Sequence, residues 1–190
     1  MTYVNSRLHA QHEGECLCCG RVATTLSRRG LLRGAVAAGA LAVLAPRLGL
    51  AAEGNYEAMI LACIDPRVQE PVHAYSAKQG LTGNYSQFVI AGAAIGVVSP
   101  KFADWHKAFW DNLAVTIELH HIKKVIAIDH RDCGAAKLAY SEASVATPEK
   151  ETETHRLALT EFRKQVGERQ PKLAVETGLM ALDGSMIMFS

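Results

Sequence analysis

The sequence has little net charge and no long apolar run. Lysines and arginines number 20 against 19 aspartates and glutamates, a formal net charge of +1, so no basic surplus points to nucleic acid as a partner. The longest charge-free apolar run, residues 34–46, is shorter than the roughly 20 residues of a membrane-spanning helix. The composition is instead 49% hydrophobic and 21% charged, which is typical of a folded globular domain.

The charge is unevenly distributed, because residues 1–51 contain six arginines and only two glutamates. A basic n-region (1–33) precedes an apolar core (34–46) and small residues near Ala51, the three-part pattern of an export signal. Residues 27–33, Ser-Arg-Arg-Gly-Leu-Leu-Arg, resemble the twin-arginine signals that export folded bacterial proteins. We therefore interpret residues 1–51 as a twin-arginine leader and residues 52–190 as one folded domain.

This leader predicts a partner and a location. Residues 27–51 would bind the twin-arginine translocation machinery, and the domain would work in the periplasm, or at the inner membrane if the signal stays attached. Cleavage after Ala51 fits the small-residue rule, and cleavage after Ala52 stays open. A buried alanine-rich helix is the alternative interpretation of residues 34–46, although Pro46 would end it.

The five cysteines fall into two groups. Cys16, Cys18 and Cys19 lie in the leader, where they could bind a metal or belong to an unstructured segment. Cys63 and Cys133 lie in the domain. In an oxidising compartment these two could form a disulfide, which is the first alternative to the metal site argued below.

The hydrophobic pattern of residues 52–190 predicts an α/β domain. Short apolar runs at 58–62, 88–91 and 125–128 suit strands that are buried on both faces, as in a parallel sheet. Helical spacing of apolar residues, or a helix start signal, predicts helices over 102–121, from 134 through 138, and over 148–167. The chain end predicts a hairpin, with strands at 178–182 and 186–189. We expect a mostly parallel sheet flanked by helices, with a C-terminal β-hairpin.

Two motifs follow predicted strands, Cys-Ile-Asp-Pro-Arg at 63–67 and His-Arg-Asp-Cys-Gly at 130–134. The carboxyl ends of parallel strands form the ligand crevice, so the two motifs can meet there. Two cysteines and one histidine are a known ligand set of catalytic zinc, which lowers the pKa of a bound water toward neutrality. Asp65 can reach the metal or its water, and Arg67 can hold the Asp65 carboxylate.

The pattern C-x-D-x-R followed by H-x-x-C resembles that of the β-class carbonic anhydrases. The resemblance implies zinc bound by Cys63, His130 and Cys133, with zinc-bound hydroxide converting carbon dioxide reversibly to bicarbonate. It implies that Asp65 and Arg67 form the catalytic dyad, although in some members of the family this aspartate itself binds zinc and closes the site.

The same resemblance extends to the Ala-Gly segment at residues 91–92. It implies that Gly92 and Ala93 line the substrate site, with carbon dioxide or bicarbonate as the ligand. It also implies that the chain forms a homodimer or a higher homo-oligomer.

The sequence departs from that family in ways that leave other functions open. Val89 and Ile90 stand where arginine and asparagine are usual, and Asn55-Tyr56-Glu57 directly before the first strand offers no equivalent of the family's bicarbonate-binding glutamine. We also expect this compact, divergent chain to lack the N-terminal helical arms of typical members. A more apolar pocket would suit a carbonyl sulfide or carbon disulfide hydrolase. A catalytically silent zinc-binding module and a dithiol redox module are the remaining alternatives.

The acidic residues around the motifs also have simpler interpretations. Asp65 and Arg67 could be a structural ion pair at a strand end. Asp129 and Asp132 could each support His130, and the sequence favours neither.

Overall fold

A computed structural model describes residues 54–190. The predicted leader and its three cysteines lie outside the described residues. Among residues 54–190, no helix combines the length and the apolar character needed to cross a membrane.

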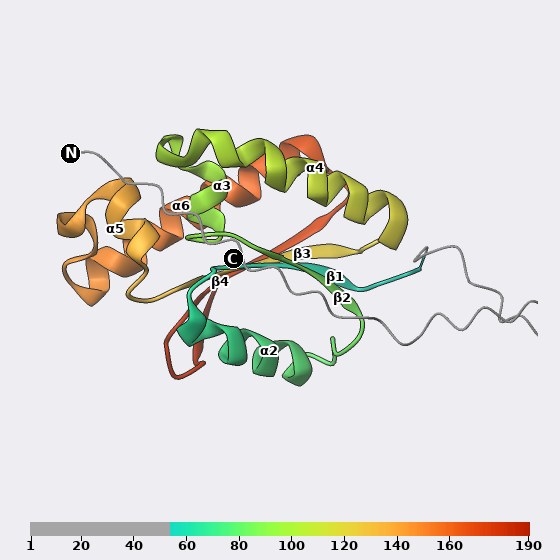
Figure 1. The fold of residues 1–190 in the computed structure, drawn as a ribbon, viewed down its shortest axis with the longest axis horizontal. Helices are drawn as coiled ribbons and strands as arrows, with labels where there is room; N and C mark the ends of the chain where they lie inside the picture. Colours follow the sequence, from blue (N-terminus) through green and yellow to red (C-terminus); the bar gives the residue numbers. More distant parts are fainter. Residues whose placement is uncertain (1–53) are drawn as a thin grey trace, which may run out of the picture. The chain divides into compact units, whose positions relative to one another are not determined.

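The centre of the domain is a five-stranded sheet with the order β2-β1-β3-β4-β5 (Figure 1). The strands are β1 (Ala58–Ala62), β2 (Tyr85–Val89), β3 (Lys124–His130), β4 (Ala174–Met180) and β5 (Met186–Phe189). β2, β1, β3 and β4 run parallel, while β5 pairs antiparallel with β4. This arrangement confirms the predicted mostly parallel sheet with a C-terminal antiparallel pair.

The strands differ in burial according to their place in the sheet. β1 is buried at every position and β3 at all but its first, as their continuous apolar sequences predict. The prediction was wrong for the second strand, which covers Tyr85–Val89 instead of 88–91 and is only partly buried, because it lies at the edge of the sheet. The first strand of the predicted hairpin was placed at 178–182, whereas β4 begins earlier, at Ala174.

Helices cover both faces of the sheet (Figure 1). They are α2 (Gln69–Lys78), α3 (Ala94–Val98), α4 (Ala103–His120), α5 (Gly134–Tyr140) and α6 (Pro148–Arg169), with single 3-10 turns at Pro66–Val68, Pro100–Phe102 and Glu142–Val145. α4, α5 and α6 confirm the three predicted helices. α2 was not predicted because it buries only Val72 and Ser76, and α3 is too short to show a period.

Alternation along β1 and β3 separates the core into two clusters. Ile60, Ile126 and Ile128 pack with Val72 of α2 on one face. Leu61, Val125 and Ala127 pack on the other face with α4 and α6, through Phe109, Leu113, Leu159 and Phe162. Because successive side chains of a strand point to opposite faces, neighbouring residues of β3 face different helices. This alternation determines which groups can meet at the end of β3.

Candidate metal centre

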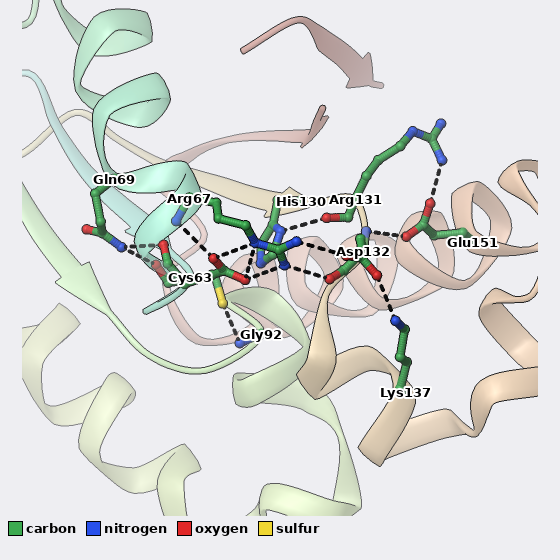
Figure 2. Close-up of polar contacts among 10 residues, drawn as sticks. Cys63, Arg67, Gln69, Gly92, His130, Arg131, Asp132, Lys137 and Glu151 are labelled. Atoms are coloured by element: carbon green, nitrogen blue, oxygen red, sulfur yellow. Dashed lines mark hydrogen bonds and ion pairs between the residues drawn. The ribbon is translucent and has the colours of Figure 1, made fainter. Parts of the chain in front are cut away.

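The two sequence motifs meet at the carboxyl edge of the sheet. β1 ends at Ala62, directly before Cys63, and β3 ends at His130, so the segments that follow these adjacent parallel strands lie side by side (Figure 2). This placement is the ligand crevice expected of a parallel sheet.

Cys63, His130 and Cys133 converge at one point. Their candidate ligand atoms, two Sγ and one imidazole nitrogen, all lie within 4.8 Å of one another. The three residues are 4%, 1% and 2% exposed. Both cysteines are free thiols, so the disulfide alternative is not the state seen here. Two sulfurs and one imidazole form a donor set that suits zinc.

The histidine ring is oriented for a ligand at Nε2. His130 Nδ1 lies 2.8 Å from the Arg131 carbonyl oxygen, which can only accept, so Nδ1 donates and carries the proton. Nε2 is buried without a hydrogen-bond partner among the described residues. A buried nitrogen that lacks a partner is costly, and coordination of a metal would satisfy it. The donor set and this unsatisfied nitrogen therefore both fit zinc.

Cys63 is the sulfur most favoured as a thiolate. A hydrogen bond from the Cys133 thiol, together with the neighbouring His130 imidazole and the Gly92 backbone N–H, lowers the pKa of Cys63 to about 4 against the opposing effect of burial. The Gly92 nitrogen lies 3.2 Å from Cys63 Sγ. Sharing of one proton between the sulfurs has the opposite effect on Cys133, whose pKa is raised. The pair thus already accommodates negative charge.

Asp65 and Arg67 form a bidentate ion pair. Arg67 donates from Nη2 to Asp65 Oδ2 at 2.7 Å and from Nε to Oδ1 at 3.0 Å, while its backbone N–H donates to Oδ1 at 2.9 Å. The guanidinium hydrogen bonds lower the pKa of Asp65 to about 2. Near neutral pH, Asp65 is therefore a carboxylate that accepts hydrogen bonds and cannot donate one.

Arg67 also joins the two motifs. Its Nη1 donates to Asp132 Oδ2 at 2.8 Å and its Nη2 to the Asp132 carbonyl at 3.1 Å. Asp132 further accepts a hydrogen bond from Lys137 Nζ at 2.7 Å. Asp132 thus contacts Arg67 and Lys137 but not the His130 ring, so its contact with the site runs through the dyad.

Sequence reasoning missed two residues that brace the motifs. Gln69 Nε2 donates to the carbonyl oxygens of Cys63 and Asp65, at 2.9 and 3.0 Å. Glu151, which is 9% exposed on α6, accepts from the Asp132 backbone N–H at 2.6 Å and from Arg131 Nη1 at 2.9 Å (Figure 2). The sequence had shown Glu151 only as an acidic residue at a helix start, so it gave no indication of this role.

Gly92 and Ala93 lie beside the cysteine but use their amides within the protein. The Gly92 N–H reaches Cys63, and the Ala93 N–H donates to the Ile90 carbonyl at 3.1 Å. Gly92 has a φ of 80°, and a Cβ there would lie 2.9 Å from the Ala135 Cβ. Glycine is therefore required at position 92 both for its backbone conformation and for close packing.

An apolar groove of about 350 Å³ lies next to the metal centre. Ile64 and Ala91, which contribute to it, are the chain neighbours of Cys63 and Gly92. Val89 and Ile90, the two positions that depart from the β-class pattern, also line the groove, together with Trp105. Asp104 is the one charged residue of the lining, so the groove is apolar apart from this carboxylate.

Comparison with known proteins agrees with this geometry. A family described as "Putative carbonic anhydrase" matches residues 53–167, which include both motifs. An uncharacterized protein of Rickettsia bellii is 36% identical over 126 residues, covering 66% of this chain and 77% of its own length. An uncharacterized protein of Rickettsia conorii is 33% identical, covering 66% and 68%.

Solved β-carbonic anhydrases share the fold. The carbonic anhydrase of Streptococcus mutans gives a TM-score of 0.50 at 15% identity, covering 88% of this chain and 100% of that one. The β-carbonic anhydrase CcaA gives 0.52 at 14% identity, covering 85% and 94%. One of two tetrameric β-carbonic anhydrases of Sordaria macrospora gives 0.50 at 13% identity, covering 85% and 95%. At such identities the likeness concerns the fold alone.

Proposed function

Because this chain belongs to the putative carbonic anhydrase family, we propose that it catalyses the zinc-dependent, reversible hydration of carbon dioxide to bicarbonate. The observation that carries the proposal is the convergence of Cys63, His130 and Cys133 within 4.8 Å at the carboxyl edge of a parallel sheet. These three residues would hold the metal through two sulfurs and His130 Nε2. When bound, zinc supplies a hydroxide nucleophile at neutral pH.

The dyad has a defined task in this proposal. The bidentate pair with Arg67 keeps Asp65 ionised and directs both carboxylate oxygens to the guanidinium. Asp65 would therefore serve as a hydrogen-bond acceptor for a nucleophile held at the metal centre. Asp132 of the other motif accepts from Arg67 and is itself held by Lys137, so that the guanidinium stays beside Asp65.

A second substrate class is favoured by the groove beside the site. The groove is lined mainly by apolar residues such as Ile64 and Ile90, with Asp104 as its one charged residue, and this lining suits a small, neutral, linear molecule. Carbon dioxide meets this description, and so do carbonyl sulfide and carbon disulfide, which hydrolyse through the same attack. Rate measurements with each of the three compounds would separate a hydratase from a carbonyl sulfide or carbon disulfide hydrolase.

Assembly and location belong to the same proposal. We propose a homodimer or higher homo-oligomer, since β5 exposes Ile187 (46%) and Met188 (48%) at an edge of the sheet. We also propose export through the twin-arginine route on the basis of the Ser-Arg-Arg-Gly-Leu-Leu-Arg pattern at residues 27–33. Folding and metal binding in the reducing cytoplasm would then protect Cys63 and Cys133 from oxidation.

The zinc content of the purified full chain tests the central claim. Cys63→Ser should lose about one zinc per chain and the hydration of carbon dioxide, followed by stopped flow with a pH indicator. Glu153→Gln, an exposed substitution on α6 outside the site, is the control and should keep both. A wild-type chain without zinc, with Cys63 and Cys133 linked, would refute the hydratase and leave a dithiol redox or structural protein. Bound zinc without turnover of any of the three compounds would establish a silent zinc-binding module.

A further inference from the structure

A second pair of buried polar side chains lies behind the metal centre. Asp129 and His155 are 1% and 0% exposed, and His155 Nδ1 lies 2.8 Å from Asp129 Oδ2. Asp129 directly precedes His130 on β3, but its side chain points to the opposite face of the sheet, toward α6. The suggestion that Asp129 fixes the His130 ring was therefore wrong, since Asp129 contacts a different histidine.

The Asp129 carboxylate also holds the start of α3. Its Oδ1 accepts from the Ala94 backbone N–H at 2.9 Å. Ala94 is the first residue of α3, and Ala93 before it provides no side-chain cap. Asp129 thus supplies from β3 the acceptor that the short helix lacks within its own sequence.

The segment before α3 carries the hydrogen bond to the metal centre. Gly92, two residues before Ala94, donates its N–H to Cys63 Sγ at 3.2 Å. Between them Ala93 has a φ of 47°, a conformation that is unfavourable for alanine and persists only when its surroundings impose it. The Gly92 N–H can therefore point at Cys63 only while the Ala94 N–H is held in place.

His155 determines how firmly Asp129 is held. Burial raises the pKa of the Asp129 carboxyl, and the hydrogen bond with His155 opposes this rise. With Asp129 ionised, His155 Nδ1 donates, and its Nε2 is buried with no hydrogen-bond partner among the described residues. A histidine confined to this one contact has no other polar role in the surrounding core. Glu151, one helical turn earlier on α6, holds the Asp132 backbone N–H in the same way on the other side of the site.

We propose that His155 is a positioning residue of the metal centre, which acts through Asp129 and the start of α3 to aim the Gly92 N–H at Cys63. This inference rests on the proposed zinc site. It assigns a role in metal binding to a fully buried side chain that does not touch the metal ligands.

Two amide substitutions of His155, to asparagine and to glutamine, test whether the hydrogen bond from the Nδ1 position to Asp129 matters for metal binding. The amide nitrogen of His155→Asn can take the place of Nδ1 and donate to Asp129, whereas that of His155→Gln takes the place of Nε2 and cannot. We expect His155→Asn to bind zinc within threefold of the wild-type affinity, measured on the full chain by chelator competition. His155→Gln should lose about tenfold or more, the range found for groups that orient metal ligands indirectly.

A spectroscopic measurement and a stability control separate positioning from general destabilisation. In the cobalt-substituted chain, loss of the hydrogen bond to Cys63 should shift the thiolate-to-metal charge-transfer band in His155→Gln but not in His155→Asn. Val166→Ala, a buried apolar truncation farther along α6, should lower the Tm without weakening zinc binding or shifting the band. If His155→Gln does not fold, Asp129→Asn is the second variant, because it places a neutral amide beside His155 in place of the carboxylate. It should show the same loss of zinc affinity and the same shift of the cobalt band.

The outcomes distinguish this inference from the proposed function. A wild-type chain that binds no zinc would refute the proposed function. A wild-type chain that binds zinc, with His155→Asn and His155→Gln alike in zinc affinity and in the cobalt spectrum, would refute the positioning role alone.

Discussion

Substitution of Gly92 by alanine tests how closely the metal centre depends on one backbone position. The new methyl group would lie 2.9 Å from the Ala135 Cβ, 3.3 Å from the Ile95 Cβ and 3.4 Å from the Gly96 nitrogen. The first distance is shorter than a carbon–carbon contact of about 3.5 to 4.0 Å allows, so the segment or α5 must move. Movement of the segment carries the Gly92 N–H away from Cys63.

The magnitude follows from two separate costs. A φ of 80° costs alanine about 1 to 2 kcal/mol relative to glycine, and overpacking of a buried site costs about 1 to 3 kcal/mol more. Gly80 provides a matched control, because its φ is 70° and a methyl group added there would meet no atom within 4 Å. Gly80→Ala therefore incurs only the backbone cost, and the difference between the variants isolates the steric one.

The assay compares both variants without metal and with zinc. At roughly 4 °C per kcal/mol, the metal-free Gly92→Ala chain should melt about 4 to 12 °C below Gly80→Ala. Its zinc affinity should fall about tenfold or more, while Gly80→Ala keeps the wild-type affinity. Ala135→Gly removes the opposing methyl group and should restore part of the loss. Equal Tm and equal zinc affinity in the two alanine variants would refute the reasoning.

Three further outcomes are expected. Arg67→Gln removes the cause of the lowered Asp65 pKa, so the wild-type advantage in stability should be full above pH 4 and vanish as the pH falls to about 2; a difference that grows in acid would contradict this. Glu151→Gln should lower the free energy of unfolding by about 2 kcal/mol, because it opposes an amide to Arg131, whereas the exposed Glu153→Gln should change urea denaturation little. Removal of zinc by a chelator should lower the Tm, since His130 Nε2 then stays unsatisfied, and an unchanged Tm would argue against the ligand role.

The sequence was most informative where local pattern and burial agree. β1 and β3 are central strands with continuous apolar sequences, and the two motifs follow them directly, so convergence at the sheet edge could be predicted. The position of the edge strand β2 was predicted wrongly. We expected a continuous apolar run, which is typical of a central strand, whereas β2 is only partly buried and has a mixed sequence. α2 was missed because its polar sequence buries only two side chains.

The contacts that support the site could not be predicted, since they join residues far apart in the chain. The hydrogen bonds from Gly92 to Cys63, from Asp132 to Glu151 and from His155 to Asp129 span 29, 19 and 26 positions. Each depends on how a helix or loop packs against the end of β3, and periodicity carries no such information. The metal ligands could be predicted from residue type, whereas the hydrogen bonds that hold them depend on packing.

The alternation of β3 explains why one helix can support both sides of the centre. His130 faces the two cysteines, and Asp129 beside it faces α6. Glu151 and His155 are four positions apart on α6, so both lie on the helix face that meets the sheet. One contacts the segment after β3, and the other contacts β3 itself. Polar substitutions on this face of α6 should therefore alter metal binding, while apolar truncations on the same helix should alter stability alone.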